Sequence, residues 1–279
     1  MRLIGPFIFA ILCTTLVCPA AAPGTPGGLP PGEKDAKAVL EKSPRHGEWV
    51  DIAVPDKKVP LKSYIVYPER PDKAPVVIVI HEIFGESDWI RGVADQLAAD
   101  GFIAIAPDLL SGHGKDGGGT DSLGGRDEVV KAIRGLKSPE VMSDLDAVRG
   151  YGTKLSSASG KTATIGFCWG GGQSFAYAAH QPKLDAAVVY YGTPPAEGEL
   201  ANVQAPVLGN YGGSDNRVTS TVAPTEAAMK KLGKSYTPHV YEGAGHGFLR
   251  AQDGQDGANL KATEQAWPAT IAFLREHTH

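Results

Sequence analysis

The stretch Thr164–Gly172, which reads TIGFCWGGG, places one cysteine between glycines directly after a run of strand-forming residues. Its central part, G-x-C-x-G, is a cysteine version of the nucleophile elbow, in which a sharp strand-to-helix turn exposes one side chain. Taken alone the pattern is weak, because a lone cysteine is more often a small buried apolar residue. Its position after a predicted buried strand and before a predicted helix favours Cys168 as a nucleophile.

Strands alternate with helices on both sides of this stretch. The expected strands cover residues 48–53, 61–67, 75–80, 102–106, 161–167, 186–191, 206–211 and 236–242, and the expected helices include 138–155, 169–180 and 225–232. Such alternation predicts a mostly parallel sheet with helices on both faces. The first two strands are joined by a short polar turn and predict an antiparallel start. We therefore expect one α/β domain over residues 47–279.

Composition narrows the function classes. The 279 residues suffice for one large buried core. With 27 basic and 31 acidic residues and no basic cluster, the chain lacks the electrostatic footprint of a nucleic-acid-binding protein. Chemistry on a small molecule is the better expectation.

The N-terminal residues resemble a secretory signal. Arg2 precedes an apolar stretch, residues 3–17, and small residues follow at 20–22. The stretch is shorter than the ~20 apolar residues needed to span a bilayer. We predict a signal peptide over residues 1–22 and an exported product, periplasmic or secreted, with no stable membrane span; lipid attachment at Cys18 remains an alternative.

Two consequences follow from cleavage near residue 22. Cys13 and Cys18 would be removed, which leaves Cys168 as the only cysteine and excludes an internal disulfide. Residues 23–46 are rich in Pro, Gly and Lys and show no apolar periodicity. They predict a flexible lead-in to the domain.

A thiol nucleophile needs a base that is oriented by a third group. Asp215 follows the strand expected at 206–211, and His246 follows the strand expected at 236–242. The order nucleophile, acid, histidine is that of the elbow-bearing folds. Each residue alone has an ordinary explanation, an Asx-turn for Asp215 and a loop histidine for His246, but their joint placement favours a Cys168–His246–Asp215 triad.

The loop after the strand at 75–80 reads His81-Glu82-Ile83-Phe84-Gly85. It begins like the zinc motif H-E-x-x-H but lacks the second histidine and is not helical, so no metal is expected. In an acyl-transfer site of this architecture the same loop supplies an oxyanion donor. We expect the backbone N–H groups of Ile83 and Trp169 to fill that role.

The motifs HEIFG, GFCWGG, AVVYYG, GGSD and GAGHGFLR together resemble the dienelactone hydrolase family of α/β-hydrolases, from about Gly47 to the C-terminus. The resemblance implies an α/β-hydrolase fold, with Cys168 as nucleophile, His246 as base and Asp215 as its acid. It also implies that Glu82 contacts the resting thiol, where a carboxylate would oppose ionisation. No cofactor is implied.

The same resemblance suggests substrate contacts. Arg250 matches a family arginine that binds the substrate carboxylate, and Arg126 is the nearest candidate for a second one. Independently of the resemblance, Tyr191 ends the strand expected at 186–191 and is a candidate pocket residue, although strand aromatics more often only pack. The expected substrate is a small, carboxylate-bearing lactone or ester. A broad carboxylesterase and a non-catalytic binding or thiol-sensing protein are the alternatives.

Overall fold

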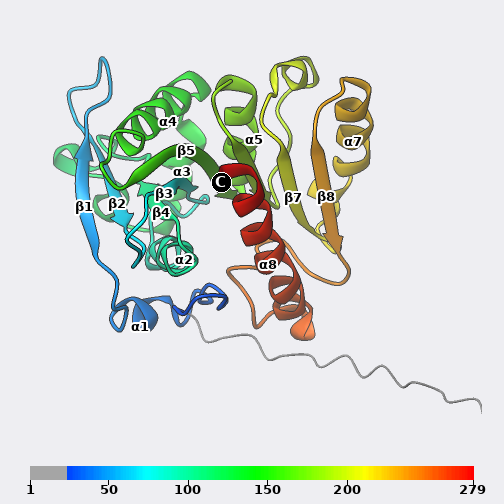
Figure 1. The fold of residues 1–279 in the computed structure, drawn as a ribbon, viewed down its shortest axis with the longest axis horizontal. Helices are drawn as coiled ribbons and strands as arrows, with labels where there is room; N and C mark the ends of the chain where they lie inside the picture. Colours follow the sequence, from blue (N-terminus) through cyan, green and yellow to red (C-terminus); the bar gives the residue numbers. More distant parts are fainter. Residues whose placement is uncertain (1–23) are drawn as a thin grey trace, which may run out of the picture.

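The computed structural model describes residues 24–279, so the predicted signal peptide lies outside the described residues. One eight-stranded sheet, in the order β1-β2-β4-β3-β5-β6-β7-β8, forms the middle layer (Figure 1). Its strands are β1 Gly47–Ile52, β2 Leu61–Val66, β3 Ala74–Ile80, β4 Ile103–Pro107, β5 Ala158–Phe167, β6 Ala186–Tyr190, β7 Val207–Gly212 and β8 Tyr236–Tyr241.

The strand directions confirm the predicted architecture. β2 pairs antiparallel with both β1 and β4, and every pairing from β4 through β3, β5, β6 and β7 to β8 is parallel. All seven residues of β3 are buried, as its continuous apolar run predicts. Parallel strands end at one edge of the sheet, so the loops that follow β3, β5, β7 and β8 meet there.

Helices cover both faces of the sheet. α2 (Asp88–Ala99) and α8 (Ala258–Thr278) pack on one face, and α4 (Ser138–Gly152), α5 (Trp169–His180) and α7 (Val222–Lys231) pack on the other. Within residues 24–279, none of the helices combines the length and the apolar character that crossing a membrane requires.

Three details of the helices differ from the sequence-based expectation. α3 (Arg126–Gly135) was not expected, because only Val129 and Ile133 of its ten residues are buried and its apolar stripe is short. Leu155 lies beyond the end of α4. The sequence predicts that Pro268 either kinks the last helix or marks its start; it lies inside α8, ten residues after the helix begins, so it does not mark the start.

Residues 24–46, predicted as a flexible lead-in, pack against the domain. They form α1 (Ala36–Leu40), which lies against α2, and they bury Leu29. The Arg45 guanidinium bonds to the Asp95 carboxylate at 2.5 Å, with both side chains 3% exposed. Periodicity could not reveal this packing, because the segment is held by a few individual contacts rather than by an apolar stripe.

Candidate active site

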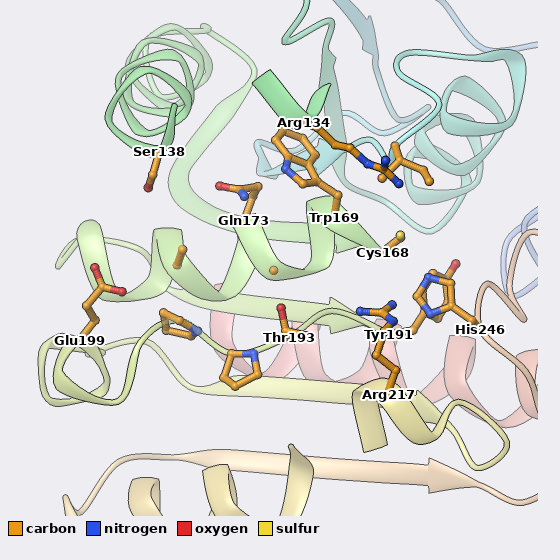
Figure 2. A pocket seen from close by; sticks show the side chains of 15 residues that line it. Arg134, Ser138, Cys168, Trp169, Gln173, Tyr191, Thr193, Glu199, Arg217 and His246 are labelled. Carbon is orange, nitrogen blue, oxygen red and sulfur yellow. The ribbon is translucent and has the colours of Figure 1, made fainter. Parts of the chain in front are cut away.

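Four side chains named from the sequence lie at the edge of the sheet where the parallel strands end. Glu82 follows β3, Cys168 follows β5, Asp215 follows β7 and His246 follows β8. Cys168 and His246 open onto the same cavity (Figure 2). The structure therefore brings together groups that are up to 164 residues apart in the chain, the separation of Glu82 and His246.

The turn at Cys168 has the backbone of a nucleophile elbow. Cys168 has φ 55° and ψ −115°, a conformation that non-glycine residues rarely adopt. A Cβ on Gly166 would lie 2.0 Å from the carbonyl oxygen of Gly170, and a Cβ on Gly170 would lie 2.3 Å from that of His81. Only glycine fits at either position, which explains the G-x-C-x-G spacing.

The sulfur of Cys168 receives hydrogen bonds from the backbone N–H groups of Trp169 and Ile83, the two predicted oxyanion donors. Both bonds lower the pKa of the thiol. Burial and the nearby Glu82 carboxylate have the larger effects, and the pKa of Cys168 is raised above its ordinary value. The resting side chain is therefore a thiol, with two N–H donors already converging on it.

His246 is held by Asp215. Its Nδ1 lies 2.5 Å from Oδ2 of Asp215, whose side chain is 7% exposed. Because a carboxylate only accepts hydrogen bonds, the imidazole proton lies on Nδ1 and leaves Nε2 free to accept another. Tyr191 packs edge-on against the imidazole with ring centroids 5.1 Å apart, and it too lines the cavity.

Glu82 is buried next to the thiol. Its Oε1 lies 2.6 Å from Nε of Arg250, and Nη1 of the same arginine bonds to Glu33 of the N-terminal segment. Burial raises the pKa of Glu82 to about 7, more than the positive charge of Arg250 lowers it. Near neutral pH this carboxyl group can therefore lose or gain a proton.

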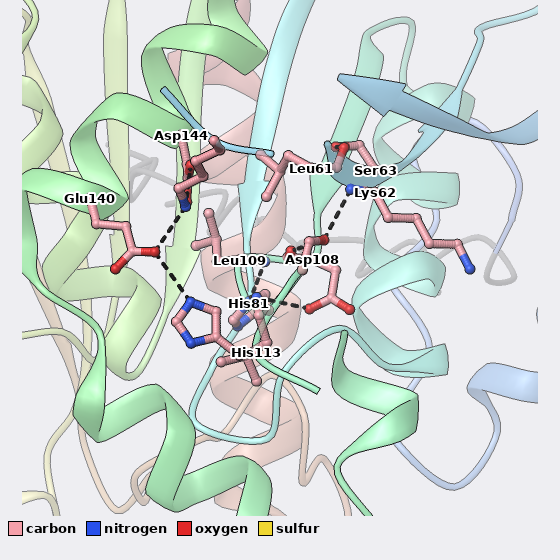
Figure 3. A network of polar contacts seen from close by, with 12 residues as sticks. Leu61, Lys62, Ser63, His81, Asp108, Leu109, His113, Glu140 and Asp144 are labelled. Atoms are coloured by element: carbon pink, nitrogen blue, oxygen red, sulfur yellow. Dashed lines mark hydrogen bonds and ion pairs between the residues drawn. The ribbon is translucent and has the colours of Figure 1, made fainter. Parts of the chain in front are cut away.

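His81 fixes the loop that carries Glu82 and Ile83. Its Nε2 accepts a hydrogen bond from the Leu109 N–H at 3.2 Å (Figure 3). Its Nδ1 donates to the Glu82 carbonyl at 3.0 Å, and its ring stacks on Trp169. The contacts of this buried histidine are thus structural. Within residues 24–279, no cluster of three or more histidine, cysteine or carboxylate side chains could hold a metal ion.

The cavity around Cys168 has a volume of about 750 Å³, and the two arginines expected to contact substrate do not line it. Its wall does not include Arg250, whose guanidinium is held by two carboxylates, or Arg126, which stacks on the Phe84 ring at 3.5 Å. Arg134 and Arg217 line it instead. No motif pointed to these two residues, although Arg217 stands only two residues after Asp215.

Comparison with known proteins identifies the family. The sequence model described as "Dienelactone hydrolase family" matches residues 61–278. Proteins from Yersinia pestis and Escherichia coli K12, both named "Putative carboxymethylenebutenolidase", are 30% identical over 81% of this chain, and the matches cover 88% and 86% of their own lengths.

Solved structures show the same fold. A "Putative Dienelactone Hydrolase" from Klebsiella pneumoniae superimposes with a TM-score of 0.72 at 26% identity, over 83% of this chain and 98% of that one. A dienelactone hydrolase-like promiscuous phosphotriesterase from metagenomic libraries gives 0.70 at 24% identity, over 84% and 99%. The predicted α/β-hydrolase fold is confirmed. The chain belongs to the dienelactone hydrolase family and is a hydrolase that acts on ester bonds.

Proposed function

We propose that the protein hydrolyses a small lactone or ester through a Cys168–His246–Asp215 triad and an acyl-enzyme. One observation carries the proposal. Cys168, whose sulfur accepts hydrogen bonds from the N–H groups of Ile83 and Trp169, lines the same cavity as His246. Nδ1 of His246 is hydrogen-bonded to the buried carboxylate of Asp215. These residues supply the kinds of group that acyl transfer requires: a nucleophile, a base, an orienting acid and oxyanion donors.

In the first half of the reaction, Nε2 of His246 takes the thiol proton while the sulfur bonds to the substrate carbonyl carbon. The oxygen of the tetrahedral intermediate is stabilised by the N–H groups of Ile83 and Trp169. When the intermediate collapses, the carbon–oxygen bond to the alcohol breaks and His246 returns the proton to that oxygen. The product is a thioester at Cys168.

In the second half, His246 takes a proton from water as the water oxygen attacks the thioester carbon. Collapse of the second intermediate breaks the carbon–sulfur bond, releases the acid and returns the proton to the sulfur. Asp215 stays ionised and stabilises the imidazolium in both halves.

The test uses the protein from residue 23 onward with p-nitrophenyl acetate, dihydrocoumarin and a dienelactone. Cys168→Ala is expected to abolish turnover, and Asp215→Asn to lower kcat by about 10³- to 10⁴-fold. Intact-mass spectra of the quenched wild-type enzyme should show one added acyl group, absent from Cys168→Ala. Turnover by Cys168→Ala would overturn the mechanism, and an absence of turnover and of acylation with every substrate would favour a binding or thiol-sensing protein.

A further inference from the structure

Two arginines enter the Cys168 cavity from different elements. Arg134 belongs to the last turn of α3, and Arg217 belongs to the short helix α6 (Asn216–Thr219). In Figure 2 the sulfur of Cys168 lies between their guanidinium groups. Both side chains are exposed to solvent, so each can meet a ligand that enters the cavity.

These two arginines differ from all others in the described part of the chain. Neither guanidinium has an ion-pair, hydrogen-bond or aromatic partner among residues 24–279. Every other arginine in that range has one: Arg45, Arg70, Arg91, Arg126, Arg149, Arg250 and Arg275. The unpaired guanidinium groups are therefore confined to the cavity.

Their positions relative to the proposed reaction differ. Arg134 follows Ile133, a member of a small apolar cluster that packs against Ile83 and Trp169. In the proposed reaction the N–H groups of these two residues face the carbonyl oxygen. Arg217 stands two residues after Asp215, on the side of His246, which protonates the departing alcohol (Figure 2). Arg217 also lowers the pKa of Cys168, so its charge acts on the reacting atom.

We propose that Arg134 and Arg217 select anionic substrates, with Arg134 binding a carboxylate on the acyl part and Arg217 a carboxylate on the alcohol part. This inference rests on the proposed function. A guanidinium binds a carboxylate through two parallel charge-assisted hydrogen bonds, and these two have no internal partner to give up. Glu199, at the other end of the cavity, would repel the same anion and hold it at the Cys168 end (Figure 2).

The test compares three esters: neutral p-nitrophenyl acetate, the mono-p-nitrophenyl ester of adipic acid with its carboxylate on the acyl part, and p-acetoxybenzoate with its carboxylate on the leaving group. The variants are Arg134→Gln and Arg217→Gln. Lys131→Gln is the matched control, because it removes an exposed charge from α3 that pairs with Glu128 and does not line the cavity.

Arg134→Gln is expected to raise KM for the adipate ester about 10- to 100-fold, and Arg217→Gln to do the same for p-acetoxybenzoate. The ratio of kcat/KM for an anionic ester to that for p-nitrophenyl acetate is the decisive quantity, since any change in thiol pKa affects both esters alike. Lys131→Gln should leave the ratio unchanged.

An unchanged ratio in both arginine variants would overturn the inference, as would an equal fall in Lys131→Gln. The neutral ester separates the two proposals. If its turnover still requires Cys168 while the ratios stay constant, the triad stands and only the anion selection fails. If its turnover survives Cys168→Ala, the proposed function itself fails.

Discussion

Nε of Arg250 lies 2.6 Å from Oε1 of Glu82, and this ion pair is buried beside the sulfur of Cys168. The arginine is held from its other side by Glu33, so it does not reach the cavity that Cys168 lines. Glu82 keeps its carboxylate close enough to raise the pKa of the thiol. Burial of the thiol raises its pKa most, and the negative charge of Glu82 raises it further, so the charge state of this carboxyl group affects how readily Cys168 ionises.

Replacing Glu82 by glutamine should make the thiol ionise more easily. Glu82→Gln removes a negative charge that raises the pKa of Cys168, so the pH midpoint of alkylation by iodoacetamide is expected to move to lower pH. The measurement is the alkylation rate between pH 6 and about 11. Glu86→Gln, a buried acid on the same loop that does not act on the thiol pKa, is the control. An unmoved midpoint in Glu82→Gln would contradict this account.

Glu82 should also make stability depend on pH. Its pKa is about 7 in the folded protein against an ordinary value of 4.5, so the folded state binds the proton more tightly. Stability from this group is complete below pH 4.5 and falls as pH rises through about 7, by on the order of 3 kcal/mol. Urea unfolding at pH 5 and pH 8 should show a smaller loss in Glu82→Gln than in the wild type, and equal losses would refute the prediction.

The turn that exposes Cys168 should not accept an added methyl group. Gly170→Ala places a Cβ 2.4 Å from the Ile80 carbonyl oxygen and 2.3 Å from that of His81, both backbone atoms that cannot move cheaply. A loss of several kcal/mol, or failure to fold, is expected. Gly172→Ala is the matched comparison in the same helix, where the nearest atom is 3.4 Å away. Its free energy of unfolding should stay equal or rise by up to about 1 kcal/mol.

The N-terminal segment should contribute to the stability of the whole domain. Arg45→Met leaves Asp95 as a buried carboxylate without its ion pair, and about 3–5 kcal/mol of unfolding free energy should be lost. Arg70→Met removes an arginine whose partner Asp72 is 78% exposed and 3.6 Å away, and should cost under about 1 kcal/mol. Urea denaturation of both variants measures the difference. Similar small losses would mean that the segment is not part of the cooperative unit.

The core of the site could be predicted from the sequence because its residues stand at fixed places in a regular architecture. Cys168, Asp215 and His246 each follow a strand whose apolar pattern is visible, and parallel strands bring such positions together. Arg134 and Arg217 could not be predicted in this way. Arg134 lies on a mostly polar helix, and which of its exposed side chains faces the cavity depends on how that helix packs.

The packing of residues 24–46 could not be predicted for the same reason. Arg45 has its partner 50 residues away, and Glu33 has its partner 217 residues away, so neither contact leaves a local pattern. Composition alone suggested flexibility, because proline and glycine occur both in mobile linkers and in irregular packed segments.

The contact between Glu33 and Arg250 also limits how this enzyme can be recombined with its relatives. A chimera that keeps the domain from Gly47 onward but replaces residues 24–46 would lose Glu33, one of the two carboxylates that hold Arg250. The arginine would then rely on Glu82 alone, and Glu82 would ionise more easily without the negative charge of Glu33. Exchange of residues 24–46 would thus change the pKa of Cys168, although this segment does not line the cavity next to Cys168 and His246.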